Sequence, residues 1–438
     1  RKSKQSESFR CGFKGVASWC LFDWAHQPFP TVITTFIFST FFIKSVAPNE
    51  IKGTEYWSWA VAVSGIFVAI LAPILGSICD KSSRRKPWLF VLAMITIICS
   101  ALLYFTEPSI SWLWWALIFY AVANIAYECS QVFYNALMIG ISPPSKIGRL
   151  SGWGWGTGYF GGIVCLLLSL YLVQGGFLSA TMAVKYICII VSIWFFIFAL
   201  PLFFFTPDLT NQKSKKSFSA VISEGVSDLK STLKDVQKYK YVFLYFIAHL
   251  IYADGLTTLF AFGGIYAAGT FHMSTSDIIK FGIAMNVTAG IGSFCFSWVD
   301  DKLGSKFTIM LSLICLMVLT FAILLVNNVV YFWIIGLMLC VFVGPVQASS
   351  RSYMAHVSPP HKITQFFGLY ALTGRMTAFI GPALLGVLTA VFKSQRAGMS
   401  IILIMFLLGF VLMLYVPNEK KGKTYDEAEK ELPVNEDI

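Results

Sequence analysis

The chain has 438 residues, of which 57% are hydrophobic and only 13% are charged, and its formal net charge is +11. A soluble protein of this size needs more polar surface, so the composition excludes a water-soluble globular protein. The basic balance alone would also fit a nucleic-acid-binding protein. The basic residues, however, collect in alternate connections between apolar runs, so nucleic acid is not an expected partner.

Long apolar runs recur along almost the whole chain. About 20 helical residues cross a hydrocarbon core of about 30 Å, so each run predicts a membrane-spanning helix. The strands of a barrel would instead alternate apolar and polar residues, which is not the pattern here. Twelve spans are predicted over residues 17–46, 55–79, 87–106, 111–140, 150–173, 182–205, 241–270, 275–299, 306–326, 329–351, 365–392 and 397–416.

The same pattern predicts the domain organisation. The first apolar run has no signal-peptide cleavage site, so we expect it to remain in the protein. The expected order is a cytoplasmic N-terminal segment (1–16), a six-helix bundle (17–205), a cytoplasmic linker (206–240), a second six-helix bundle (241–416) and a cytoplasmic tail (417–438).

The basic residues predict the orientation. They are dense in the loop "DKSSRRK" (80–86), in the linker and near both ends of the chain, and sparse in the other set of connections. By the positive-inside rule, both termini and the even-numbered loops face the cytoplasm, and the expected location is the inner (plasma) membrane.

The linker carries a helical pattern in "FSAVISEGVSDLKSTLKDV". Its apolar residues recur at helical spacing, which predicts an amphipathic helix along the cytoplasmic face. The alternative is a disordered linker. The apolar residues of the pattern are Phe218, Val221, Ile222, Val226, Leu229, Leu233 and Val236.

Neither a metal site nor a cofactor is expected. The ten cysteines form no CxxC pair, and the five histidines form no HxxxH or HExxH motif. No GxxxxGK[ST] motif occurs, which leaves ATP-driven transport unsupported. The stretch "GTGYFG" (156–161) matches GxGxxG but lies inside a predicted span, where glycines favour close helix packing.

The two halves of the chain resemble one another. "SPPSKIGRLSGWGWGTG" (142–158) aligns with "SPPHKITQFFGLYALTG" (358–374) at a constant offset of 216. "DKSSRRK" has a weaker counterpart in "DKLGSK" (301–306), and "FDWA" (22–25) and "YADG" (252–255) both place an Asp early in a first span. Two parallel six-span repeats are the organisation of one large transporter class.

The loop after the second span resembles the signature GxxxD(R/K)xGRR(R/K) of the major facilitator superfamily. Gly76, Asp80, Arg84 and Arg85 match it, and Ser83 stands where the signature has its second Gly. The resemblance implies that this loop latches the two halves, with the Asp capping a helix across the interface. The cytoplasmic gate candidates are Asp80, Arg84, Arg85, Asp301 and Arg351.

Four longer stretches resemble the vacuole-effluxer-like branch of that superfamily, which includes fungal autophagy-linked amino-acid exporters. They are "LFDWAHQPFPTVITTFIFSTFF", "FYNALMIGISPPSKIGRLSGWGWGTGYFGG", "YADGLTTLFAFGGIYA" and "QASSRSYMAHVSPPHKITQFFGLYALTGRMTAFIGP". His26-Gln27 replaces the usual Asn-Ser, and Arg375 replaces a common Lys, so the branch's substrate does not transfer directly. The compact length resembles bacterial members.

Ionisable residues inside spans are costly and therefore mark functional candidates. In the fourth span Asn124, Glu128, Gln131 and Asn135 share one helical face, which predicts a substrate pathway or, alternatively, an interhelical hydrogen-bond seam. The substrate-binding candidates are His26, Gln27, Asn124, Tyr127, Glu128, Gln131, Tyr252, Asp254 and Arg375.

Three carboxyl groups are candidates for proton coupling, namely Glu128, Asp254 and Asp23. Asp23 either takes part in transport or pairs with a loop Arg. His26 either titrates or is a packed histidine. Arg375 is a fixed cation that either holds a substrate anion or pairs with Asp254 or Glu128.

The predicted function is secondary active transport of a small polar or zwitterionic metabolite, such as an amino acid, with the proton as coupling ion. The expected partners are this substrate and the lipid bilayer, and the expected state is a monomer. The alternatives are transport of another small organic anion or siderophore-like compound, a non-transporting receptor, or a channel. A membrane enzyme would need a clustered His or Asp constellation, which the sequence lacks.

Overall fold

The computed structural model describes residues 12–82, 84–176, 178–208, 218–234, 239–273, 275–376 and 380–419. Within these ranges every regular element is a helix. Eleven of the described helical segments are long and apolar enough to cross a membrane.

The first half of the chain forms one bundle. Its first span runs from Phe13 to Val46 and changes helix type along its length. The elements are α1 (Phe13–His26), η1 (Phe29–Phe36), α2 (Phe38–Phe41), η2 (Phe42–Val46), α3 (Glu50–Ser82), α4 (Lys86–Leu102), η3 (Leu103–Phe105), η4 (Ile110–Trp112), α5 (Leu113–Ile141), η5 (Pro144–Lys146), α6 (Ile147–Gln174) and α7 (Ala180–Phe205).

The second half forms a matching bundle after the linker helix α8 (Phe218–Lys234). Its elements are α9 (Lys240–Phe271), α10 (Thr275–Leu303), α11 (Ser305–Leu325), α12 (Val329–Val357), η6 (Pro360–Lys362), α13 (Ile363–Met376), α14 (Ile380–Phe392) and α15 (Gln395–Tyr415).

One departure from a continuous α-helix has a local cause in proline. Pro28 and Pro30 lack the N–H that an α-helix needs, and the wider π-helical turn of η1 begins at Phe29. Within the span predicted over 365–392, the structure describes α13 up to Met376 and α14 from Ile380.

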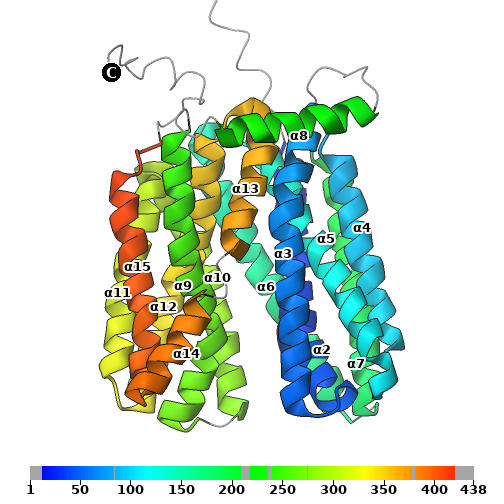
Figure 1. The fold of residues 1–438 in the computed structure, drawn as a ribbon, viewed down its shortest axis with the longest axis vertical. Coiled ribbons are helices and arrows are strands. Elements are labelled where there is room, and N and C mark those ends of the chain that lie inside the picture. Colours follow the sequence, from blue (N-terminus) through cyan, green and yellow to red (C-terminus); the bar gives the residue numbers. More distant parts are fainter. Residues whose placement is uncertain are drawn as a thin grey trace, which may run out of the picture.

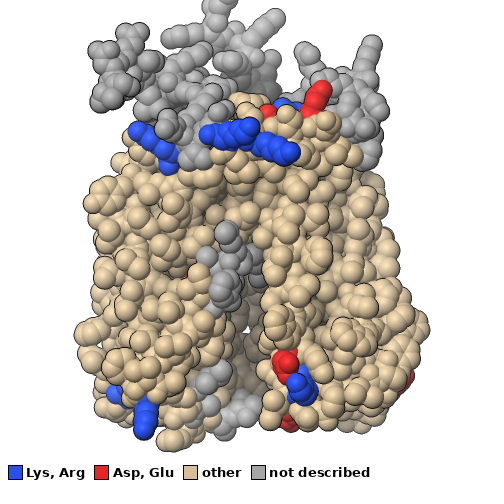
Figure 2. Space-filling model, in the orientation of Figure 1, with Lys and Arg blue, Asp and Glu red and all other residues tan. Residues whose placement is uncertain are grey.

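The two bundles lie side by side, with α8 running across one end of both (Figure 1). They pack against each other through α3 with α13 and through α6 with α10. Figure 2 shows that the surface is hollowed between the bundles from mid-height toward the end opposite α8. The chain is thus an all-α membrane protein built from two pseudo-symmetric six-helix bundles.

The outer surface is that of a lipid-embedded protein. Large apolar side chains such as Trp59, Ile70, Phe204 and Val318 are more than half exposed. On the face seen in Figure 2, charged side chains gather near the two ends and leave an uncharged belt between them. Hydrocarbon rather than water is the solvent that suits such a belt.

Helix α8 packs closely on the end of α3. A Cβ on Gly225 would lie 2.8 Å from the Ile78 Cα, and the Ser77 hydroxyl donates to the Gly225 carbonyl at 2.6 Å. Of the apolar residues in the predicted amphipathic pattern, Leu229 is buried against the bundle, whereas Ile222 and Leu233 are exposed. The side chains of Phe218, Val221 and Val236 lie outside the described residues.

Candidate functional site

Arg351, in α12 of the second half, lies in the interface between the bundles, about two turns before the end of α12. Its side chain is 4% exposed. The guanidinium Nη1 lies 3.1 Å from Asp23 Oδ2 in α1, and Nη2 donates to the Ser151 carbonyl in α6 at 2.6 Å. Among the described residues, its hydrogen-bond partners all belong to the first half.

Aromatic rings of the first half complete the socket around Arg351. The guanidinium carbon lies 5.0 Å from the Trp19 ring centre and 5.7 Å from that of Trp155, so cation–π attraction adds to the ion pair. Gly154 leaves no room for a side chain here, because a Cβ would lie 2.4 Å from Asp23 Oδ2. We call Trp19, Asp23, Asn135, Ser151 and Trp155 the Arg351 socket.

Asp23 connects the Arg351 socket to the polar face predicted for the first span. The Tyr134 hydroxyl donates to Asp23 Oδ2 at 2.8 Å, and His26 Nε2 lies 3.1 Å from Asp23 Oδ1. His26 is 2% exposed, and its Nδ1 lies 3.4 Å from the Tyr127 hydroxyl. The cation that meets Asp23 therefore comes from a span of the other half and not from a loop.

The polar residues of the fourth span have different neighbours. Asn124 donates to the Ser64 hydroxyl of α3 at 2.7 Å, which is a hydrogen bond between helices of one bundle. Asn135 accepts from Arg351 at 3.4 Å. Gln131 Nε2 is buried without a hydrogen-bond partner among the described residues, and Glu128 is half-buried.

Asp254, in the first span of the second repeat, contacts its own half. Its Oδ2 accepts from the Gly381 N–H in the first turn of α14 at 2.9 Å. Its Oδ1 is buried without a hydrogen-bond partner among the described residues. The backbone of Arg375 belongs to α13, but its side chain lies outside the described residues.

A cavity of about 160 Å³ adjoins the Arg351 socket. Trp155 is the lining residue that comes from the first half, and the other residues that line the cavity come from the second half. Of the predicted binding residues, Tyr252 lines it. The lining is Trp155, His249, Tyr252, Ala253, Leu256, Thr257, Phe260, Gln347, Ser350 and Tyr370.

Trp155 and Tyr370 were missed by sequence reasoning. Trp155 lies in the glycine-rich "GWGWGTG", and that run of small residues is the signal that could have drawn attention to its large ring. Gln27, also predicted, is half-buried beside Gly162 of α6.

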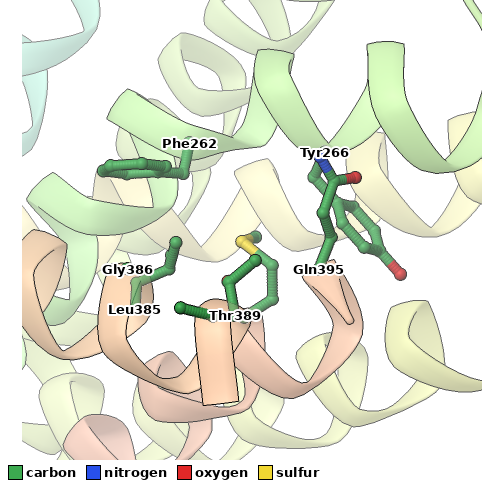
Figure 3. A pocket seen from close by; sticks show the side chains of 8 residues that line it. Phe262, Tyr266, Leu385, Gly386, Thr389 and Gln395 are labelled. Atoms are coloured by element: carbon green, nitrogen blue, oxygen red, sulfur yellow. The ribbon is translucent and has the colours of Figure 1, made fainter. Parts of the chain in front are cut away.

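A second cavity, of about 290 Å³, lies within the second half. Figure 3 shows it between Phe262 of α9 and Leu385, Gly386 and Thr389 of α14. Its lining is mainly apolar and includes none of the predicted site residues. We therefore place the candidate substrate site at the cavity between the halves.

Two clamps join the halves at the α8 end. In the first, Asp80 of α3 accepts from the backbone N–H groups of Thr364 and Gln365, at 3.2 and 2.8 Å, and so caps α13. Arg85 pairs with Asp80 at 3.1 Å and donates to the Thr364 hydroxyl at 2.7 Å. Arg84, also predicted at the gate, is exposed.

The second clamp is the pseudo-symmetric counterpart of the first. Asp301 of α10 accepts from the Arg149 N–H in the first turn of α6 at 2.9 Å. The Arg149 side chain also pairs with Asp301, at 3.1 Å. Each half thus caps a helix of the other, and together with the Arg351 socket the clamps close the α8 end.

Comparisons with known proteins agree with this architecture. The chain is 26% identical to an uncharacterised MFS-type transporter, YxiO, of Bacillus subtilis, over 95% of this chain and 98% of that protein. It is 22% identical to autophagy-related protein 22 of Saccharomyces cerevisiae, over 72% of this chain and 69% of that protein.

Solved structures show the same fold at low identity. The proton:xylose symporter XylE superposes with a TM-score of 0.75 at 15% identity, over 95% of this chain and 98% of that one. The transporter FucP in the outward conformation gives 0.72 at 13% identity, over 92% and 98%. The model of the vacuole effluxer Atg22-like family matches residues 42–141 and 142–426, and the chain belongs to this family of major facilitator transporters.

Proposed function

We propose that this protein is a secondary active transporter that moves a small polar or zwitterionic metabolite by alternating access. One observation carries the proposal: Arg351 of one half is buried in the other half at one end of the interface, while the surface between the halves is hollowed toward the other end. Such a contact is well placed to form in one conformation and break in the other.

The end closed by α8 faces the cytoplasm in this proposal, and the protein lies in the inner membrane as a monomer. Lys81, Arg84, Arg85, Lys86 and the linker helix α8 lie at this end, which supports the assignment through the positive-inside rule. Both termini are then cytoplasmic.

The cavity beside the Arg351 socket supports the substrate class. Its polar groups are an amide (Gln347), hydroxyls (Tyr252 and Ser350) and an imidazole (His249), and Trp155 and Tyr370 add aromatic faces. Such a lining suits a small ligand that combines hydrogen-bonding groups with an apolar part, as amino acids do. Arg375 is proposed to hold the ligand's anionic group.

The proposed coupling ion is the proton, and the candidate carriers remain Glu128, Asp254 and Asp23. Asp23 contacts the other half, since it pairs with Arg351. Neutralising its carboxylate by a proton would leave Arg351 without its counter-ion and favour opening of the α8 end.

The test begins with a thermal-shift screen of the purified protein against amino acids and other small polar metabolites. Any stabilising compound is then assayed in proteoliposomes for saturable counterflow and for uptake driven by a pH gradient. A proton-coupled carrier gives both saturable counterflow and gradient-driven uptake. If Glu128 carries the proton, the variant Glu128→Gln should lose gradient-driven uptake and retain counterflow. Ligand binding without counterflow would indicate a receptor, and non-saturating flux a channel.

A further inference from the structure

His356 lies in the last turn of α12, half-buried at the α8 end of the interface. Its Nδ1 is 2.8 Å from the Ser352 carbonyl oxygen in the same helix. Its Nε2 is 2.9 Å from the Pro144 carbonyl oxygen, in the turn between α5 and α6 of the other half. The imidazole thus bridges the two halves.

Both partners of this imidazole are carbonyl oxygens, which only accept hydrogen bonds. A neutral imidazole carries one N–H and one acceptor nitrogen, so it can satisfy only one of the two contacts. An imidazolium donates from both nitrogens. Only an imidazolium could therefore donate to both oxygens at once.

The charges around His356 also favour the imidazolium. A small cavity of about 70 Å³ brings it together with Asp300 and Asp301 of α10 and Glu419 after α15. On the side of the first half, Arg149 of α6 is paired with Asp301. Lys306 of α11 lies beside Glu419. Three carboxyl groups thus face two cations besides the histidine, and the last turn of a helix is itself favourable for a cation.

We infer that His356 is a proton-binding site of the gate at the α8 end, distinct from the carboxyl groups proposed for coupling. The proton is bound while this end is closed, because only then does the Pro144 carbonyl accept from Nε2. By linkage, a site that binds a proton more tightly in the closed state makes closure weaker as pH rises. The inference rests on the proposed alternating access.

The experiment measures closure without any substrate. Nitroxide labels at Lys146→Cys and His361→Cys, both exposed and on opposite halves, report the distance across the gate by pulsed electron spin resonance in nanodiscs. The remaining cysteines are replaced by alanine. We expect the ratio of the short-distance to the long-distance population to fall about tenfold between pH 5.5 and pH 8, the effect of losing one charge-assisted hydrogen bond.

Two variants sharpen the test. In His356→Gln the ratio should no longer fall as pH rises, and at pH 5.5 it should be at most that of the parent protein at pH 8. In His356→Arg, a fixed cation with several donors, the ratio should also no longer fall as pH rises, and at pH 8 it should be as high as that of the parent at pH 5.5. The control is His272→Asn, far from the gate in a left-handed conformation (φ 54°) that Asn tolerates, and it should retain the parent's pH dependence.

Two outcomes overturn the inference in distinguishable ways. If two distance populations exist but His356→Gln keeps the parent's pH dependence, His356 is not the site, and the proposed transport cycle is unaffected. If a single distance persists at every pH in every variant, the proposed alternating access fails as well.

Discussion

Asp23 and Asp254 each lie in the first span of a repeat, yet the structure uses them differently. Asp23 accepts from a cation of the opposite half, at 3.1 Å, whereas Asp254 accepts from a backbone N–H of its own half, at 2.9 Å. At the offset of 216, the residue of the first half that matches Arg351 is Asn135, which carries no charge. Each first span thus has a carboxyl group, but Arg351 of the second half meets the one in the first.

The difference teaches how a duplicated fold can acquire distinct roles for the carboxyl groups in its two first spans. Asp23 is bound to a partner that separates from it if the halves rock apart. Asp254 holds the beginning of α14, which moves with α9 in the same bundle. We therefore expect variants of Asp23 to act on closure, and variants of Asp254 to act on local helix stability.

The largest effect is expected from Asp23→Asn, which leaves the Arg351 charge buried without a carboxylate. Breaking a buried ion pair by removing one partner costs about 3–5 kcal/mol. The closed population measured with the labels at positions 146 and 361 should be lost. The double variant Asp23→Leu with Arg351→Met, which buries no charge, should recover part of it, and no recovery would contradict a pairwise role.

The next effect is expected from Gly154→Ala, which leaves both charges present but forces them apart. The added Cβ would lie 2.4 Å from Asp23 Oδ2 and 2.7 Å from Arg351 Nη2. Overpacking of this kind costs about 1–3 kcal/mol, so the closed population should fall less than in Asp23→Asn.

The matched control for Gly154 is Gly65→Ala in α3, where an added Cβ meets no atom within 4 Å. It should raise the melting temperature slightly, since Ala favours a helix more than Gly does. Equal loss of closure in both glycine variants would show that steric pressure on the Arg351 socket is not the cause.

A smaller and purely local effect is expected from Asp254→Ala. Loss of the hydrogen bond to the Gly381 N–H removes a helix-terminus contact worth about 1 kcal/mol. Amide exchange over residues 380–384 should become faster while the distance across the gate stays unchanged. A fall in the closed population as large as that of Asp23→Asn would abolish the distinction between the two aspartates.

The smallest effect is expected at the rim of the interface. Asp228 of α8 lies 3.2 Å from Lys81 of the first half and 3.2 Å from Lys362 of the second. These side chains are 13–34% exposed, and partly solvated pairs contribute at most about 1 kcal/mol. In Asp228→Asn the closed population should fall slightly at low salt and be indistinguishable from the parent at high salt.

Much of the fold followed from the sequence because helix length and hydropathy are local properties. Eleven of the twelve predicted spans, the fold class and the family resemblance are confirmed by the structure and the comparisons. The π-helical turn that begins at Phe29 was not predicted, although Pro28 and Pro30 are its signal.

The partners of the ionisable residues were harder to predict. Asp23 and Arg351 are 328 positions apart, so their contact depends on how the two bundles meet and on which end is closed. Helical periodicity places Asp23 and His26 on one face but contains no information about the opposing helix. The residues that line the cavity were hard to predict for the same reason, because Trp155 and Tyr370 come from different halves.

The attachment of α8 has a practical consequence. Its backbone is held against α3 by the close approach at Gly225, whereas Lys362 of the second half reaches it through side-chain contacts with Asp228 and Thr232. If the halves rock, α8 should therefore travel with the first of them. A fluorophore on its exposed residue Lys230, paired with one on α11, would then report each turnover optically from outside the substrate route.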